Sequence, residues 1–130
     1  MNTLIIDTTY ESCSASIVDN DMHCHYSFNN SNKLQSETIT EVVFDTLDKA
    51  EVSLKDINNI IVTNGPGNFT SIRVGVSFAL GFAKGISLPL YSLSSLELLS
   101  IFANKEIPSD KKFISIMPSR ADELFVQAFD

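Results

Sequence analysis

A glycine-rich turn between an apolar strand and a helix constrains this chain more than any other part of its sequence. Gly65 and Gly67 flank Pro66 directly after an apolar run over residues 60–63, and such a turn is rigid. A helix is expected to follow at once, with Thr70 and Ser71 as residue types that cap free N–H groups. These turns either present backbone N–H groups to an anion or a partner, or connect a strand to a helix. Turn chemistry alone favours the plain connection.

Three short strands are expected at the start of the chain. Residues 2–8 form a continuous apolar run that ends in Asp7, which is typical of a strand covered on both faces. Residues 13–18 alternate between apolar and polar, and residues 22–28 alternate again after a polar turn at residues 19–21. The three strands are therefore predicted to form a meander.

Helices and strands are then expected to alternate. Apolar residues at helical spacing predict one amphipathic helix over residues 35–50. The elements expected after it are a strand at 58–63, a helix at 70–85, a strand at 88–92, a helix at 94–102 capped by Ser94, a linker at 104–111 and strands at 113–117 and 124–129.

The order βββαβαβα is that of one half of the actin/Hsp70/sugar-kinase ATPase fold (ASKHA, ribonuclease H-like). This is an α/β fold with helices flanking a mixed five-stranded sheet. Residues 1–104 are expected to form this N-terminal domain, and residues 105–130 to begin an incomplete second domain with two strands.

Composition excludes several classes of function. Hydrophobic residues make up 44% and charged residues 19%, as in ordinary globular domains. A net charge of −7 argues against direct binding to a nucleic-acid backbone. Cys13 and Cys24 are too few for a disulfide framework; reduced core thiols are expected, with a bridge between neighbouring strands as the alternative. With no signal segment or membrane-length apolar run, the chain is expected to be cytoplasmic, without membrane contact.

The first predicted turn argues against autonomous ATP hydrolysis. In the ATPase superfamily the first hairpin wraps the nucleotide phosphates and needs small residues where its backbone approaches them. Here Asp7 is followed by Thr8, Thr9, Tyr10 and Glu11, without glycine. A carboxylate such as Asp7 at a strand end can orient a water or a metal, but a turn or capping role is favoured.

Neither a metal site nor a nucleophilic site is predicted. His23 and His25 lie two apart in a predicted strand and would share a face, so a weak surface metal site is the alternative to two solvent-facing histidines. Neither histidine has a readable arrangement with an acidic residue and a serine or cysteine nucleophile. No catalytic residue is assigned.

The helix after the glycine turn is apolar nearly all round. Val74, Phe78 and Phe82 form one stripe, and a second stripe contains Ile72, Val76, Ala79 and Ala83. One stripe is expected to meet another helix or another chain, the alternative being that both are buried within this chain. Close helix–helix approach would explain Gly75, Gly81 and Gly85, which each cost about 1 kcal/mol against alanine. Arg73, in the first turn, should have a partner such as a carboxylate or a nucleotide phosphate, unless it is a plain surface arginine.

Four segments together resemble one family. Residues 64–75 resemble the Gly-Pro-Gly-Ser-Phe-Thr-Gly-x-Arg-x-Gly signature of the TsaB (YeaZ) family, with Asn68 and Ser71 as departures. Residues 4–16 resemble the family's opening strand, Asp-Thr turn and second strand, and residues 92–96 its Val-Ser-Thr-Leu. Residues 120–125 resemble its Arg-x-x-Glu-Val-Tyr, although Pro118 and Ser119 replace the preceding Asp-Ala. Their order and spacing agree along the whole chain.

The resemblance implies a non-catalytic subunit that binds and activates TsaD, which transfers a threonylcarbamoyl group to an adenosine of tRNA. TsaE, the small ATPase of that system, is a second implied partner, and a homodimer through the same helices is implied for the isolated chain. The implied partner interface consists of Gly65, Pro66, Gly67, Phe69, Thr70, Arg73, Val74, Gly75, Phe78 and Phe82.

The chain is expected to have no cofactor of its own. The resemblance implies ATP or ADP at an interface shared with TsaD and TsaE, and Asp7, Thr8 and Arg73 are the candidate contacts. Two alternatives come from other classes: a nucleotide-binding enzyme of the ATPase superfamily, kinase-like or metallohydrolase-like, and a free-standing homodimeric structural protein.

Overall fold

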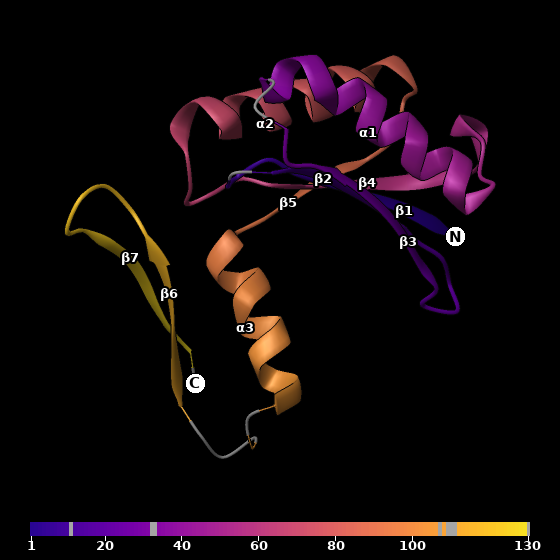
Figure 1. Ribbon diagram of the computed structural model, residues 1–130. Coiled ribbons are helices and arrows are strands. Elements are labelled where there is room, and N and C mark those ends of the chain that lie inside the picture. Colours follow the sequence, from indigo (N-terminus) through magenta and orange to yellow (C-terminus); the bar gives the residue numbers. More distant parts are fainter. Residues whose placement is uncertain (11, 32–33, 107, 109–111, 130) are drawn as a thin grey trace.

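The chain folds as alternating strands and helices in the expected order (Figure 1). A computed structural model describes residues 1–10, 12–31, 34–106, 108 and 112–129. Its elements are β1 (Asn2–Asp7), β2 (Cys13–Val18), β3 (Cys24–Asn29), α1 (Gln35–Ala50), a 3₁₀ turn (Leu54–Asp56), β4 (Ile57–Thr63), α2 (Phe69–Gly85), β5 (Leu90–Leu93), α3 (Ser95–Glu106), β6 (Phe113–Pro118) and β7 (Leu124–Phe129). Among the described residues, no helix is long and apolar enough to cross a membrane.

The first five strands form one mixed sheet in the order β3-β2-β1-β4-β5. Strands β1, β2 and β3 pair antiparallel, and β4 runs parallel to both β1 and β5. Helices α1 and α2 cover the same face of this sheet (Figure 1). The fold is therefore the predicted ASKHA-like, ribonuclease H-like α/β arrangement.

The last two strands form a separate antiparallel pair that packs beside α3. Helix α3 ends at Glu106, four residues beyond the predicted end, so the predicted domain boundary after residue 104 falls inside it. Residues 107 and 109–111 of the predicted linker lie outside the described residues. The division of the chain into two domains stays a prediction.

The core lies between the sheet and the two helices. Its apolar side chains come from β1, β2, β4, α1 and α2, and the most deeply buried are Leu4, Ile6, Ile17, Val43, Ile60, Val62 and Ala79. The α1 side chains in this core are Ile39, Val42, Val43 and Leu47, which helical spacing had predicted to share one face. Helix α1 also has the predicted bounds, residues 35 and 50. Burying them stabilises the fold by roughly 1.5–3 kcal/mol per large side chain.

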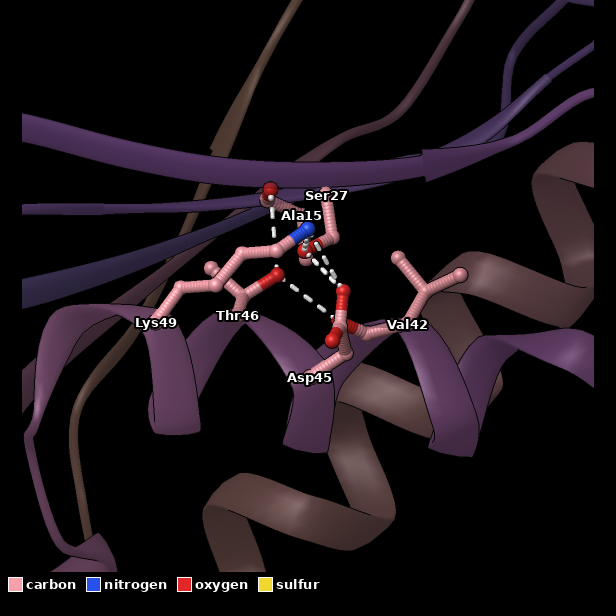
Figure 2. Close-up of polar contacts among 6 residues, drawn as sticks. All are labelled: Ala15, Ser27, Val42, Asp45, Thr46 and Lys49. Atoms are coloured by element: carbon pink, nitrogen blue, oxygen red, sulfur yellow. Dashed lines mark hydrogen bonds and ion pairs between the residues drawn. The ribbon is translucent and has the colours of Figure 1, made fainter.

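Polar contacts fix α1 over β2 and β3 (Figure 2). The fully buried Thr46 hydroxyl lies 3.4 Å from the Ala15 carbonyl oxygen of β2. Ser27 of β3 donates a hydrogen bond to Asp45, and the Lys49 ammonium lies 2.8 Å from the same carboxylate. The hydrogen bonds from Lys49 and Ser27 lower the pKa of Asp45. Helix α1 is thus held to the edge strand by a three-residue polar cluster.

Both cysteines were expected to be buried thiols, and only one of them is buried. Cys13 is buried in β2, as expected, but Cys24 is exposed because it opens the edge strand β3. In the register of these strands Cys13 pairs with Asn29 and Cys24 with Val18, so the two thiols stand at opposite ends of the strand pair and both are free.

Candidate functional site

The glycine-rich turn packs against the turn between β1 and β2. A Cβ atom at Gly67 would lie 2.1 Å from the Thr9 carbonyl oxygen, and one at Gly75 would lie 2.2 Å from the Thr8 hydroxyl oxygen. Gly65 is buried and has φ +101°, a left-handed backbone conformation that favours glycine. The motif glycines are therefore required by backbone conformation and by contacts within this chain.

Hydrogen bonds join the same two turns. The Asn68 amide donates to the Thr9 carbonyl oxygen at 2.9 Å, and the Thr8 hydroxyl donates to the Ser71 carbonyl oxygen at 2.7 Å. The Asn68 side chain also accepts from the Ser71 amide at 3.1 Å, which makes Asn68 the N-cap of α2. The prediction that Thr70 and Ser71 cap this helix is wrong, because the helix begins one residue earlier and an asparagine stands before it.

Asp7 organises the first turn. Its Oδ1 atom accepts hydrogen bonds from the Thr9 amide at 2.9 Å, the Thr9 hydroxyl at 2.7 Å and the Thr63 hydroxyl at 2.6 Å. Both threonines are buried. The carboxylate therefore holds the end of β1 to the end of β4, which is the turn role that the sequence favoured.

Helix α2 presents a mixed surface to solvent. Phe69 is 67% exposed and Leu80 is 55% exposed, and Arg73 lies on the same outward side. The Arg73 guanidinium stands 5.5 Å from the centre of the Phe69 ring, a cation–π contact. The sequence led us to expect a charged partner for Arg73; within the described part of the chain its recorded contact is this aromatic ring.

The two predicted stripes of α2 both contribute to this chain's own core. Ala79 and Ala83 are buried, and Phe78 and Phe82, whose rings stack at 5.5 Å, are half-buried against the core. Val74 is half-buried in the same way. Residues of both stripes therefore pack on this chain's own core, and the solvent-facing side of α2 is formed by other residues.

Close approach between helices of this chain does not explain the helix glycines. Gly75 approaches the Thr8 side chain of the β1–β2 turn rather than a helix. Gly81 and Gly85 are exposed, and a Cβ atom at either would meet nothing within 4 Å.

A cleft of about 830 Å³ opens beside the start of α2. The β1–β2 turn, the start of α1, the glycine-rich turn and the β6–β7 turn all border it. The residues that line it are Tyr10, Leu34, Gln35, Ser36, Pro66, Gly67, Asn68, Phe69, Thr70, Ser71, Ile72, Val74, Pro118, Ser119, Arg120 and Phe125. The cleft thus brings Pro66, Gly67, Phe69, Thr70 and Val74 of the predicted interface together.

Gln35 lines the cleft and was not among the predicted interface residues. Its amide nitrogen donates to the carbonyl oxygens of Tyr10 and Ser12, at 2.9 and 3.3 Å, and so ties α1 to the β1–β2 turn. Its amide oxygen is buried without a hydrogen-bond partner among the described residues. The sequence did contain a signal for this role, because Gln35 is a polar residue at the start of a strongly periodic helix.

The histidines lie at the surface, as favoured. His23 and His25 are both exposed, and the His23 ring nitrogen lies 3.0 Å from the Asp19 carboxylate. Hydrogen bonds from the His23 backbone and ring lower the pKa of Asp19. Asp21 approaches the same pair, and the three ligand atoms lie within 4.8 Å of one another on this turn.

The fold and the site define an ASKHA-like half whose first turn is filled by its own threonines and whose second helix faces solvent beside a cleft. A family model described as "TsaD: tRNA N6-adenosine threonylcarbamoyltransferase" matches residues 29–119. The chain belongs to this family, in its TsaB (YeaZ) branch.

Individual relatives agree with that assignment. The chain is 36% identical over 97 residues to the tRNA threonylcarbamoyladenosine biosynthesis protein TsaB of Escherichia coli, covering 74% of this chain and 41% of that one. It is 26% identical over 129 residues to the TsaB of Haemophilus influenzae, covering 96% and 52%. It superposes on YeaZ from Pseudomonas aeruginosa with a TM-score of 0.84 and 25% identity, covering 98% and 58%. The chain thus spans about half the length of these relatives.

Proposed function

We propose that this chain is a non-catalytic, TsaB-like subunit that binds a TsaD-like transferase and activates it in the threonylcarbamoyladenosine modification of tRNA. The relatives of this branch are named for that biosynthesis. The net charge of −7 supports a role in which the transferase, rather than this chain, holds the tRNA. A cytoplasmic location goes with this role.

The filled first turn supports a scaffold rather than an ATP-hydrolysing enzyme. A phosphate-binding hairpin needs space for oxygen atoms beside its backbone. Here the Thr9 carbonyl group and the Thr8 side chain occupy the positions nearest Gly67 and Gly75, and Asp7 is engaged by three hydrogen bonds. These groups are engaged by contacts within this chain.

The single observation that carries the docking proposal is the Phe69–Arg73 pair at the start of α2. An aromatic ring that is 67% exposed and stacked by an arginine is costly to leave in water and is typical of an interface anchor. Leu80 lies on the same side of the helix, about two turns beyond Arg73. We take Phe69, Arg73 and Leu80 as the docking surface; Val74, Phe78 and Phe82 support it from beneath, because they pack on the core.

The proposal also includes a nucleotide, ATP or ADP, and a TsaE-like ATPase as a second partner. ATP or ADP would sit where the transferase closes over the cleft. Arg120 lines this cleft, and Arg73 lies against the ring of Phe69, which also lines it. A TsaE-like ATPase would join the pair there. Nucleotide binding by the isolated chain with magnesium would favour the ATPase-superfamily alternative instead.

The test is co-expression with the TsaD-like transferase of the same genome, followed by light scattering of the purified material. We expect a one-to-one complex with the wild-type chain and at least about tenfold weaker binding for Phe69→Ala combined with Leu80→Glu, because anchor residues dominate binding energy. Tyr26→Ala is the matched control. It removes an aromatic side chain that is 63% exposed on β3, beside Ser27, which faces α1, so Tyr26 points to the other side of the sheet. A wild-type chain that does not bind the transferase contradicts the proposal.

A further inference from the structure

Strand β5 forms one edge of the five-stranded sheet. The strand order places it at the end of the sheet, where it pairs with β4 on one side (Figure 1). Five strands are the number expected for one ASKHA-like half, so β5 is an edge strand because of the topology of this fold. The outer side of an edge strand presents backbone N–H and C=O groups that the sheet itself does not pair.

The hydrogen bonds to β4 show which backbone groups of β5 face outward. The Pro89 carbonyl oxygen accepts from the Ile60 amide at 3.1 Å, and the Leu93 carbonyl oxygen accepts from the residue after β4, also at 3.1 Å. Successive residues of a strand turn their backbone groups to opposite sides. Leu90 and Ser92 therefore turn their N–H and C=O groups away from β4, and these groups form a row of two donors and two acceptors.

This edge lacks the devices that commonly protect a free edge. Proteins blunt such edges with charged side chains, with bulges or with proline. No residue from 85 to 96 is charged. The proline at position 89 removes an N–H group on the β4 side, so the outward groups of Leu90 and Ser92 are intact. Among the described residues no hydrogen bond reaches these outward groups.

A small pocket of about 300 Å³ opens beside the same edge. Val76 and Leu80 of α2 line it together with Leu90, Tyr91 and Ser92 of β5. Leu80 is 55% exposed and Tyr91 is 56% exposed, so the rim of the pocket is largely apolar and aromatic. A strand added along β5 would direct every second side chain to the α2 side of the sheet, where this pocket lies.

We propose that an extended segment of the TsaD-like transferase pairs with β5 and inserts an apolar side chain into this pocket. A backbone in extended conformation matches a row of alternating donors and acceptors, and recognition of this kind takes its affinity from main-chain hydrogen bonds and its specificity from pockets for alternate side chains. Leu80 belongs both to the docking surface on α2 and to the wall of the pocket, so the two contacts are continuous. This inference rests on the proposed function and adds a second contact to it.

Amide hydrogen exchange measured by NMR, on the chain alone and in its complex with the transferase of the same genome, tests the pairing directly. The amides of Leu90 and Ser92 should exchange at least about tenfold more slowly in the complex, because they gain acceptors there. The Tyr91 amide faces β4 and is the internal control, so it should be protected in both states. A complex that forms without slower exchange at Leu90 and Ser92 overturns this inference alone, whereas the absence of any complex overturns the docking proposal as well.

A variant that removes one outward donor gives an independent readout. Ser92→Pro deletes the outward N–H group and keeps the pairing with β4, because proline is tolerated on edge strands. It should raise the dissociation constant for the transferase about three- to tenfold, the effect of losing one hydrogen bond. Ser92→Ala keeps the N–H group and is the matched control, so it should bind like the wild type. Equal dissociation constants for the two variants overturn the inference. If Ser92→Pro fails to fold by circular dichroism, the exchange measurement decides alone.

Discussion

Gly75 of α2 packs directly on Thr8 of the β1–β2 turn. A Cβ atom at Gly75 would lie 2.2 Å from the Thr8 hydroxyl oxygen and 3.2 Å from the Thr8 Cβ atom. Thr8 is fully buried and donates to the Ser71 carbonyl oxygen one turn before Gly75. The last glycine of the motif thus serves the contact between two segments far apart in the sequence.

This contact predicts that Gly75→Ala destabilises the protein. The new methyl group would force Thr8 or α2 to move, and overpacking of this kind costs about 1–3 kcal/mol, against which better helix propensity returns up to about 1 kcal/mol. We expect a net loss of about 1–2 kcal/mol in the free energy of unfolding measured in urea. Gly81→Ala is the control: it meets open space and should stabilise the protein by about 0.5–1 kcal/mol.

A double-mutant cycle tests the cause of that loss. Thr8→Ala removes the hydroxyl that Gly75→Ala would strike, so the double mutant should lose less stability than the sum of the two single mutants. Strict additivity would show that the two positions do not contact each other as described.

Asp7 is predicted to be a structural residue. Asp7→Ala would leave the buried Thr63 hydroxyl and the Thr9 amide without their acceptor, and we expect a loss of about 1–3 kcal/mol in thermal or urea unfolding. Asp7→Asn keeps an acceptor oxygen in place and should lose less than half as much. Equal losses in the two variants would argue that the negative charge itself is needed.

The Asp45 cluster predicts a defined pH dependence. The folded-state pKa of Asp45 lies below its ordinary value because Lys49 and Ser27 donate hydrogen bonds to the carboxylate. A lowered folded-state pKa adds stability above the unfolded-state pKa, about 3.9, and that stability is lost as the pH falls through the folded-state value. Asp45→Asn should therefore be less stable than wild type at pH 7, and the difference should fade on acidification below about pH 4.

The control for that comparison is Asp48→Asn, which removes an exposed carboxylate from the same helix without touching the cluster. Its stability difference from wild type should change less over the same pH range. A difference for Asp45→Asn that grows toward acid pH has the wrong sign and would refute the assignment.

The two thiols should react at different rates. Cys24 is exposed, whereas Cys13 is 1% exposed and burial raises its pKa, which lowers the fraction of reactive thiolate. In the native protein a thiol reagent should modify one cysteine promptly and the second at least about tenfold more slowly, with both equally fast in denaturant. Replacing Cys24 by Ser should remove the fast phase; retention of that phase would mean that Cys13 is accessible.

Local patterns predicted the elements well where a single face decides them. Val42, Val43 and Leu47 at helical spacing predicted α1 with its correct bounds, because burial against one sheet face produces that spacing. The order of the elements predicted the mixed sheet, because that order is the one found in half of the ASKHA fold. Element ends were less predictable: Asn68 caps α2 in place of Thr70 because capping depends on which residue leaves the helical conformation first.

The site was less predictable because its contacts join distant segments. Nothing near Gly67 or Gly75 in the sequence shows that Thr9 and Thr8 will fill the space beside them. Helical periodicity placed Phe78 and Phe82 on a candidate contact stripe, yet both pack on the core, while Phe69 and Leu80 face solvent. Arg120 and Gln35 come together at one cleft only in the folded chain.

The most direct test of the central claim is the dissociation constant between this chain and the TsaD-like transferase of the same genome, measured by calorimetry for Phe69→Ala and Tyr26→Ala beside the wild type. Docking through the start of α2 predicts that Phe69→Ala raises the dissociation constant about tenfold or more, while Tyr26→Ala leaves it unchanged. Equal binding by all three chains, or a loss confined to Tyr26→Ala, would contradict docking through α2.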